Sequence, residues 1–257
     1  DMAFTPNYVI LNDFPLFWDP TLLGAGIHLP GFHRDMPSRF AVVPRRGDAG
    51  DVRWFEADPT FVLHFTNAYE DGDEIVLDGY FQENPTPRPL EGAPDGHGHL
   101  MAYLDEHSFR PKLHRWRFNL KTGQTTEKHL DDRILEFGMF NQRYAGKPYR
   151  YAYSTTTKPG WFLFTGFVKH DLETGESWSV NLPEGRYASE SPFVPRIGAV
   201  DEDDGYLVSF IIDENRGTSE CLVVDAKTMT PTCRIALPHK ISSGTHAVWA
   251  GRKMLRG

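Results

Sequence analysis

The stretch Asp171-Leu-Glu-Thr-Gly175 sets the architecture of this chain, because its pattern recurs on both sides. Asn119-Leu-Lys-Thr-Gly123 lies 52 residues before it, and Asp225-Ala-Lys-Thr-Met229 lies 54 residues after it. In each copy an alternating apolar run enters the polar turn and a second strand-like run leaves it, which is the pattern of a β-hairpin. A repeat of this length made of strands and turns is typical of propeller blades, where each sheet packs only on its neighbours around a central axis.

Each copy also leads to one polar residue, which follows the Asn or Asp of its turn by 17, 19 or 21 residues. The segment Ser189-Glu-Ser-Pro-Phe193 carries the middle one of the three. An earlier turn around Gly47 leads in the same way to a histidine 17 residues later. We therefore expect four polar residues to occupy equivalent places in successive blades and to converge on the axis: His64, Glu136, Glu190 and His246.

The composition describes a globular protein and argues against several other classes. The chain has 257 residues, of which 40% are apolar, so a sizeable core is expected. Its formal charge of −8, from 35 acidic and 27 basic residues, argues against a nucleic-acid partner, because phosphate neutralisation needs clustered Lys and Arg. Two cysteines, Cys221 and Cys233, are too few for a disulfide scaffold and are expected to be free thiols. The sequence shows no secretory signal or long apolar run, which favours a cytoplasmic location.

Period-two alternation runs along the chain, whereas no amphipathic period of 3.6 persists over a dozen residues, so we expect an all-β fold. Residues 7–11 and 14–17 are expected to pair as a hairpin, and residues 74–78 are expected to form a strand. The chain opens in a strand and ends where a new strand would begin, while propellers close by pairing their first and last strands. We therefore expect residues 1–257 to be a single incomplete β-propeller domain, a fragment from which N-terminal blades are absent.

Most other histidines are expected to play no part in a metal site. His97 and His99 lie in a Pro- and Gly-rich segment that offers no rigid platform. A short helix is expected over residues 100–108, and two histidines of an early loop, His28 and His33, could approach a substrate channel. The remaining ones are interpreted as surface or hydrogen-bonded side chains: His107, His114, His129, His170 and His239.

The four matched residues carry the functional argument, since the sequence has no phosphate-binding loop, no dinucleotide fingerprint and no Gly-x-Ser-x-Gly elbow. Imidazole suits iron, zinc, copper or nickel, and carboxylates either ligate the metal or hold the far nitrogen of a ligating histidine. Glu136 and Glu190 are also the kind of pair that glycoside hydrolysis uses. The spacing alone leaves three hypotheses for the four residues: a metal centre, the active site of a propeller glycosidase, or a purely structural role.

Six motifs, in order along nearly the whole chain, together resemble the carotenoid cleavage oxygenase family. That family includes carotenoid and apocarotenoid dioxygenases, bacterial lignostilbene dioxygenases and the retinal isomerohydrolase. The motifs are Asp1-Met-Ala-Phe-Thr-Pro-Asn-Tyr8, Val52-Arg-Trp-Phe55, His64-Phe-Thr-Asn-Ala-Tyr-Glu70, Glu136-Phe-Gly-Met-Phe-Asn141, Ser189-Glu-Ser-Pro-Phe193 and Gly244-Thr-His-Ala-Val-Trp249.

The resemblance implies the C-terminal portion of a seven-bladed propeller with a non-haem ferrous ion held by four histidines. His64 matches the third ligand and His246 the fourth. The first two ligands would precede this chain, the second of them immediately before Asp1. Glu136 and Glu190 match two of three glutamates that hydrogen-bond to the ligands and so serve the cofactor site indirectly.

The activity that the resemblance implies is oxidative cleavage of a conjugated C=C bond in a carotenoid, apocarotenoid or stilbenoid, with dioxygen as partner and two carbonyl products. The hydrophobic substrate leaves peripheral membrane contact open, although no basic amphipathic patch supports it. Two other readings stay open beside it: a non-catalytic propeller that acts as a binding scaffold, and a propeller glycosidase that uses Glu136 and Glu190.

Overall fold

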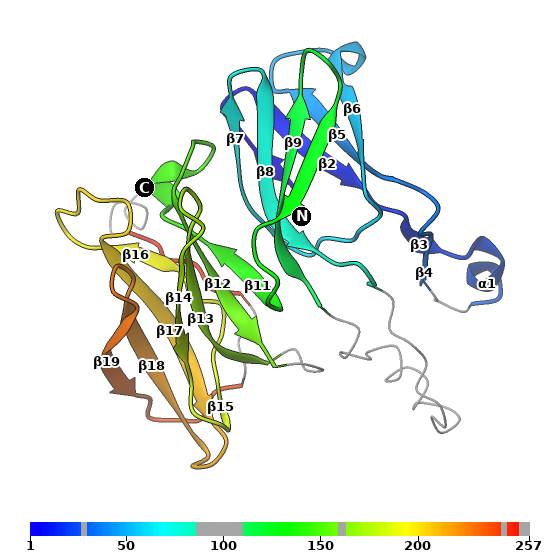
Figure 1. Ribbon diagram of the computed structural model, residues 1–257. Coiled ribbons are helices and arrows are strands. Elements are labelled where there is room, and N and C mark those ends of the chain that lie inside the picture. Colours follow the sequence, from blue (N-terminus) through cyan, green and yellow to red (C-terminus); the bar gives the residue numbers. More distant parts are fainter. Residues whose placement is uncertain (27–29, 86–109, 159–162, 243–245, 252–257) are drawn as a thin grey trace. The chain divides into compact units, whose positions relative to one another are not determined.

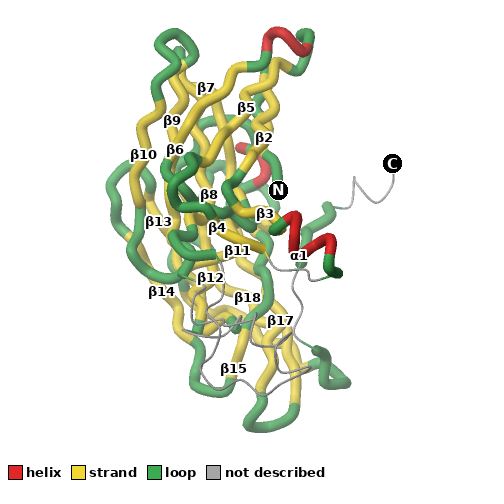
Figure 2. The backbone as a smooth tube through the Cα atoms, turned by 90° about the vertical axis from the view of Figure 1, so that its right-hand side faces the viewer, coloured by secondary structure: helices red, strands yellow, loops and turns green. Residues whose placement is uncertain are grey.

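The computed structural model describes residues 1–26, 30–85, 110–158, 163–242 and 246–251. Within these residues nearly all regular structure is β-strand, with one short α-helix, Pro20–Gly24, and short 3-10 helices (Figures 1 and 2). The described chain divides into two compact units: unit 1 holds Asp1–Leu135 with residues 145–148, and unit 2 holds Glu136–Tyr144, Tyr149–Lys158 and the chain from Leu163 onward. The expectations for His28, His97, His99 and His107 and for a helix over residues 100–108 lie outside the described residues.

Unit 1 consists of two four-stranded antiparallel sheets and a small two-stranded one. The first sheet has the order β1-β2-β5-β6, the second is the meander β7-β8-β9-β10, and β3 pairs with β4. The elements are β1 (Ala3–Phe4), β2 (Tyr8–Asp13), β3 (Leu16–Trp18), α1 (Pro20–Gly24), β4 (Pro30–Phe32), β5 (Ser38–Pro44), the 3-10 helix η1 (Ala49–Asp51), β6 (Arg53–Ala57), β7 (Phe65–Asp71), β8 (Glu74–Phe81), β9 (Lys112–Asn119) and β10 (Thr125–His129).

The two large sheets of unit 1 share one apolar core. Phe40 of β5 lies 5.5 Å from the Trp116 ring and 5.0 Å from the Phe118 ring of β9, measured between centroids. Ile10 and Leu77 are fully buried in the same cluster. Alternation explains this arrangement, because every second side chain of a strand points to the same face and the two apolar faces must be buried together.

Unit 2 contains the other two large sheets. One is the meander β11-β12-β13-β14, and the other has the order β15-β17-β18-β19, with β16 also paired to β17. The elements are β11 (Leu135–Met139), the 3-10 helix η3 (Gln142–Tyr144), β12 (Tyr151–Thr157), β13 (Phe164–Asp171), β14 (Ser177–Asn181), β15 (Arg186–Tyr187), β16 (Phe193–Pro195), β17 (Gly205–Asp213), β18 (Thr218–Asp225) and β19 (Thr230–Ala236).

Side chains join the two sheets within unit 2. The Tyr153 hydroxyl of β12 donates to the Ala226 carbonyl oxygen at 3.2 Å, and the Tyr153 ring lies 5.6 Å from that of Phe193. The buried Lys169 ammonium of β13 contacts the Asp203 carboxylate at 2.6 Å. Burial of a charged pair is tolerated when each charge faces its partner, so this contact secures the segment before β17 against β13. Cys221 and Cys233 are free thiols, as expected.

The three repeated turns have one geometry, which confirms the predicted hairpins β9-β10, β13-β14 and β18-β19. The Asn or Asp side chain that opens each turn accepts hydrogen bonds from the backbone amides two and three residues further along, at 2.9–3.3 Å. The fifth residue has a positive φ in all three, of 77°, 78° and 53°. Glycine adopts such a φ without strain, which explains the first two of the set Gly123, Gly175 and Met229.

The expected hairpin between residues 7–11 and 14–17 is wrong, whereas the expected strand over residues 74–78 is confirmed as part of β8. β2 pairs with β5 instead, with Val9 opposite Val43 and Ile10 opposite Val42. β3 pairs with β4. β5 offers β2 an apolar partner face that leads into the core, while Phe17 and Trp18 of β3 stay exposed. The larger apolar burial therefore decides the pairing.

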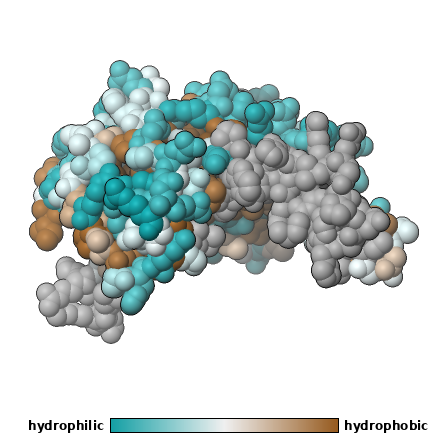
Figure 3. All heavy atoms as spheres, turned by 90° about the horizontal axis from the view of Figure 1, so that it is seen from below, coloured by the Kyte–Doolittle hydropathy of each residue, from teal (hydrophilic) through white to brown (hydrophobic). Residues whose placement is uncertain are grey.

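The described surface seen from below in Figure 3 is largely hydrophilic, with apolar residues in smaller groups. Exposed apolar side chains include Trp54 of β6 and Trp178 of β14, and Arg39 lies over the Trp54 ring. Within the described residues, no helix is both long enough and apolar enough to cross a bilayer.

Candidate functional site

His64 lies directly before β7, the first strand of the second sheet in unit 1. Its side chain is half-buried, and its carbonyl oxygen accepts a hydrogen bond from the Tyr80 amide of β8 at 3.2 Å. The next residue, Phe65, donates its backbone amide to Asp1 Oδ2 at 2.8 Å. His64 is therefore fixed through its backbone on one side by β8 and on the other by the carboxylate of Asp1.

Gly79 of β8 allows the close approach that places His64. A Cβ atom at this position would lie 2.6 Å from Phe65 Cδ1 and 3.2 Å from the His64 carbonyl oxygen. The strand register also shifts here, between Phe65 and Asn67, which marks a β-bulge. Bulges re-aim side chains next to functional sites, and the extra residue of this one, Thr66, lies two residues beyond His64.

The motif Thr5-Pro-Asn-Tyr8 and the motif that contains Glu70 meet in unit 1. Glu70 Oε1 accepts hydrogen bonds from the Thr5 hydroxyl at 2.6 Å and the Asn7 backbone amide at 2.9 Å, and Oε2 accepts one from the Asn7 side chain at 2.9 Å. Burial alone would raise the pKa of Glu70, but these bonds outweigh it and hold the pKa below its ordinary value. Glu70 thus anchors the turn between β1 and β2.

Glu136 lies on β11, the first strand of the third sheet, and is fully buried in unit 2. Its Oε2 accepts a hydrogen bond from the Phe137 backbone amide at 2.7 Å, and its carbonyl oxygen accepts one from the Thr155 hydroxyl of β12 at 2.9 Å. Phe137 has a φ of 51°, in the left-handed region that favours glycine. This backbone turn is what directs the Phe137 amide to its neighbour's carboxylate.

Glu190 and His246 lie together in the same unit. Glu190 falls between β15 and β16, both of which pair with β17, and His246 follows β19 in a segment without regular structure. His246 Nδ1 lies 3.3 Å from Glu190 Oε2, and the Ala247 amide donates to the same oxygen at 2.6 Å. The Phe137 ring stands almost perpendicular to the His246 ring, with 5.5 Å between centroids and 88° between planes.

This arrangement fits a metal ligand. An imidazole that donates its Nδ1 proton to a carboxylate carries its lone pair on Nε2, the nitrogen turned away from that carboxylate. The side chain of His246 is 66% exposed and that of Glu190 20% exposed, so Glu190 forms the buried base of the pair and the histidine presents its ring outward. The donor chemistry of His246 is that of iron, zinc, copper or nickel sites.

The serines beside Glu190 shape its segment. The Ser189 hydroxyl donates to the Glu190 carbonyl oxygen at 3.0 Å, the Ser191 hydroxyl donates to the Ser189 carbonyl oxygen at 2.9 Å, and the Ser191 amide contacts the Met139 sulfur at 3.0 Å. Met139 belongs to β11, as Glu136 does. The motifs around residues 136, 190 and 246 therefore form one packed structure.

Along the chain, His64 precedes β7, Glu136 lies on β11, Glu190 lies between β15 and β16, and His246 follows β19. Their equivalence in successive blades stays a prediction. Among the described residues, no group of three or more His, Cys, Asp or Glu side chains is arranged to hold a metal ion. The convergence of His64 of unit 1 with the cluster of unit 2 stays a prediction.

Sequence reasoning missed three contributors to these sites. The Asp1 carboxylate binds the Phe65 amide, the Ala247 amide binds Glu190, and the Phe137 ring contacts His246. Every residue except proline has a backbone amide, so the sequence does not show which amide binds a carboxylate. The signal at Phe137 was its place between a motif glutamate and Gly138, but a positive φ at a phenylalanine has no sequence signature.

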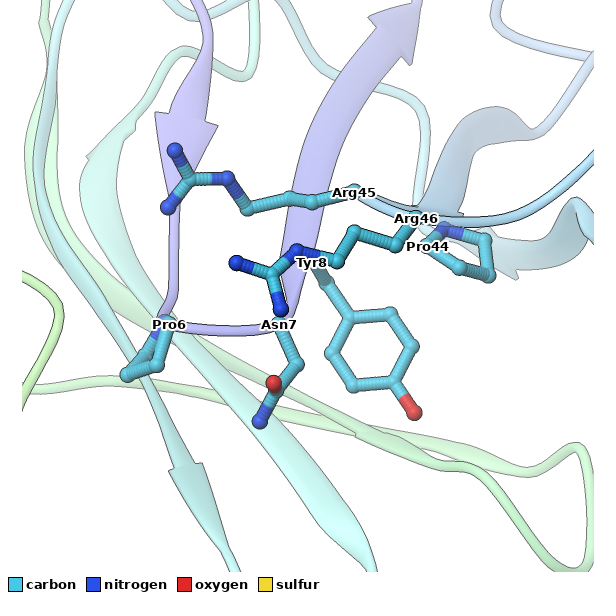
Figure 4. A pocket seen from close by; sticks show the side chains of 6 residues that line it. All are labelled: Pro6, Asn7, Tyr8, Pro44, Arg45 and Arg46. Carbon is cyan, nitrogen blue, oxygen red and sulfur yellow. The ribbon is translucent and has the colours of Figure 1, made fainter.

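Cavities elsewhere in unit 1 do not contain the predicted site residues. In Figure 4 the side chains of Arg45 and Arg46 extend over the turn between β1 and β2. The cavity drawn there has a volume of about 440 Å³ and is lined by Pro6, Asn7, Tyr8, Pro44, Arg45 and Arg46. A second cavity of about 400 Å³ is lined by Arg34, Asp58, Pro59, Phe81, Glu83 and His129.

Comparison with protein families gives one match over almost the whole chain. The model of the family described as retinal pigment epithelial membrane protein matches residues 1–251. Among curated proteins, a carotenoid 9,10(9',10')-cleavage dioxygenase of Crocus sativus is 36% identical over 279 residues, which covers 100% of this chain and 49% of that protein. The chain thus spans about half the length of the curated relatives it matches.

Two solved structures are similar to this fold. The cobalt-substituted apocarotenoid oxygenase of Synechocystis has a TM-score of 0.85 at 26% identity and covers 97% of this chain and 52% of its own. The lignostilbene dioxygenase of Pseudomonas brassicacearum has a TM-score of 0.81 at 28% identity, over 97% and 54% of the two chains. These similarities confirm the predicted fold class: the chain is all-β and corresponds to part of a β-propeller.

Proposed function

The chain belongs to the retinal pigment epithelial membrane protein family, and from that premise we propose that the full protein is a non-haem Fe(II) dioxygenase. It cleaves one conjugated C=C bond of a carotenoid, apocarotenoid or stilbenoid and gives two carbonyl products. The observation that carries this proposal is the pair of His246 Nδ1 and Glu190 Oε2 at 3.3 Å. Relatives named as carotenoid-cleavage and lignostilbene dioxygenases support the same class of reaction.

We assign each of the four matched residues a role. His64 and His246 are ligands of the metal, and Glu190 keeps His246 in the tautomer whose Nε2 binds it. Glu136 is a buried carboxylate whose negative charge partly offsets the charge of a divalent ion. When bound, a ferrous ion supplies the redox chemistry with dioxygen, so that no side chain of this chain has to be oxidised.

Part of the centre lies outside this chain. We propose that the other two histidine ligands and the remaining blades belong to the part of the full protein that the match to relatives leaves uncovered, since the chain covers 49% of its Crocus relative.

The partners proposed for the full protein are dioxygen and a hydrophobic conjugated small molecule. The relatives' printed names, which include carotenoid and lignostilbene dioxygenases, support this substrate class. Within this chain, the apolar side chain that accompanies the candidate ligand is Phe137, which is buried against His246.

The glycosidase reading is less well supported. A glycosidase needs one carboxyl group that protonates the leaving group and another that attacks or activates water. Glu190 Oε2 is occupied by His246 and the Ala247 amide, and Glu136 is fully buried with one oxygen bound to the Phe137 amide.

The test is a product assay with the full-length protein under labelled dioxygen, with a carotenoid, an apocarotenoid and a stilbenoid supplied in turn. We expect cleavage of one of the three classes, with one labelled oxygen atom in each carbonyl product. Cleavage of none of them, or a product that carries oxygen from water under conditions where carbonyl exchange is controlled, would count against the proposal. A binding scaffold would retain the hydrophobic compound without converting it.

A further inference from the structure

We propose that Phe137 is a positioning residue for His246, and that the left-handed backbone at Phe137 exists to place its ring there. The inference rests on the proposed function in one respect, the role of His246 as a ligand. Among the described residues, only two that are not glycine have a positive φ, Phe137 at 51° and Met229 at 53°. Their surroundings differ: the positive φ of Met229 is required by a turn, whereas that of Phe137 is explained by the candidate site.

Met229 is explained by its hairpin. It occupies the fifth position of the repeated turn, where the other two copies have Gly123 and Gly175 with a φ of 77° and 78°. The hairpin geometry demands a positive φ at this position whatever the residue. The turn alone therefore explains the positive φ of Met229, without reference to the candidate site.

Phe137 has no such explanation. It lies inside β11, not in a turn, and a bulky L-residue in this conformation is strained. Strain of this kind persists where the surrounding structure holds it and is found at ligand-binding and catalytic positions. Here the conformation has two visible results: the amide donates to Glu136 Oε2 at 2.7 Å, and the buried ring faces His246.

The ring of Phe137 is held on its other side as well. Phe164 of β13 packs against it with 5.0 Å between centroids and 70° between planes. Phe137 is thus supported by a strand of its own sheet and offers His246 a surface that cannot easily move. Perpendicular aromatic pairs have a preferred geometry, which a flexible aliphatic side chain does not impose.

His246 needs this support because its own segment is irregular. It follows β19 and is 66% exposed, so no strand ladder fixes its backbone. Glu190 Oε2 lies 3.3 Å from one ring nitrogen, but a contact at one end of the ring restricts the side-chain rotations χ1 and χ2 only in part. The perpendicular Phe137 ring restricts the same rotations from another direction. Both contacts therefore help to orient the nitrogen that would bind a metal.

The experiment uses the full-length protein with cobalt as the metal probe. Cobalt affinity is measured by chelator competition, cobalt geometry by the visible absorption of the bound ion, and folding by thermal unfolding of the metal-free protein. Phe137→Leu is the main variant, and Phe137→Met replaces it if the leucine variant does not fold. Phe137→Tyr retains the ring. Phe167→Leu is the matched control, because Phe167 of β13 is equally buried in unit 2.

We expect Phe137→Leu to weaken cobalt binding roughly two- to tenfold, the factor that corresponds to one aromatic pair, and to change the absorption of bound cobalt. Phe137→Tyr should bind as wild type does, and Phe167→Leu should lower the unfolding temperature while cobalt binding stays unchanged. Wild-type affinity and absorption in Phe137→Leu would overturn the proposal, as would equal losses in the leucine and tyrosine variants. A wild-type protein that binds no cobalt would instead overturn the proposed function.

Discussion

His246 Nδ1 lies 3.3 Å from Glu190 Oε2, although 55 residues and four strands of one sheet separate the two in the chain. The Ala247 amide shares the same carboxylate oxygen, so both the ring and the backbone of the histidine segment are held by Glu190. This relationship links two of the motifs that the sequence placed in successive repeats. It also puts a carboxylate beside Nδ1, an arrangement that favours a lone pair on Nε2, the nitrogen then available to a metal.

Removal of the Glu190 carboxylate should weaken the metal site without unfolding the protein. We expect Glu190→Ala to reduce metal affinity about 10- to 100-fold, the usual effect of losing a group that orients a ligand. Glu190→Gln should lose less, because its amide oxygen still accepts from the Ala247 amide or the imidazole. Chelator competition on the full-length variants measures both. Equal affinities in Glu190→Ala and wild type would contradict the assignment.

A methyl group at Gly79 should disturb His64. The new Cβ would lie 2.6 Å from Phe65 Cδ1 and 3.2 Å from the His64 carbonyl oxygen, so Phe65 and the backbone of His64 must shift. We expect Gly79→Ala to lower the free energy of unfolding by about 1–3 kcal/mol, the usual cost of overpacking, and to weaken metal binding. Urea unfolding and metal titration give the two quantities.

Gly166→Ala is the matched control for that variant. Its Cβ would lie 2.3 Å from the Val180 carbonyl oxygen, so it overpacks a strand pair, β13 and β14, that contains none of the four candidate residues. We expect a loss of stability similar to that of Gly79→Ala but unchanged metal affinity in the folded protein. Parallel losses of affinity in both variants would show that affinity follows stability alone.

Glu70 predicts a pH dependence of stability in unit 1. Its pKa is lower in the folded protein than in the unfolded chain, because hydrogen bonds from Thr5 and Asn7 outweigh the effect of burial. A carboxyl group with a lowered folded pKa stabilises fully above its unfolded pKa, near 4.5, and loses this effect as the pH falls through its folded pKa. We expect Glu70→Gln to cost about 1 kcal/mol at pH 7 and clearly less at pH 3. Urea unfolding at both values measures it, and a cost independent of pH would contradict the account.

The repeated turn predicts the effect of a side chain at Gly175. This residue has a φ of 78° and open space around its Cβ position, so the cost of a methyl group there is that of the backbone alone. We expect Gly175→Ala to lower the free energy of unfolding by about 1 kcal/mol. Gly50, which also has open space but no positive φ, is the control, and Gly50→Ala should be neutral or slightly stabilising. Equal effects in the two variants would argue against the turn geometry.

Much of the fold could be predicted because its determinants are local. The turn residues Asn119, Asp171 and Asp225 bind their own following amides, so their effect can be read from a few consecutive residues. Strand periodicity likewise identified β8. The pairing of β2 could not be read in this way, because β5 and the nearer β3 both offer strand-like residues. Core burial, a property of the whole unit, selects β5.

Some residues of the candidate site could likewise be predicted from the sequence, and others could not. His64, Glu136, Glu190 and His246 could be selected because they recur at matching distances from repeated turns and because their types suit a metal. Phe137 and the Ala247 amide could not be selected for their roles, since a strained φ and a backbone donor depend on how distant segments pack. Spacing also did not distinguish a metal centre from a glycosidase, whereas the contacts of Glu190 with His246 and the Ala247 amide favour the metal centre.

Iron content is the decisive test of His64 and His246 as ligands, and it is measured in anaerobically purified full-length protein and in two variants, His64→Ala and His246→Ala. His239→Ala is the control, an exposed histidine in the same segment after β19 as His246. We expect stoichiometric iron in the wild type and in His239→Ala, and loss of iron from both other variants while they remain folded. A wild-type protein without iron, or full iron in His246→Ala, would contradict it.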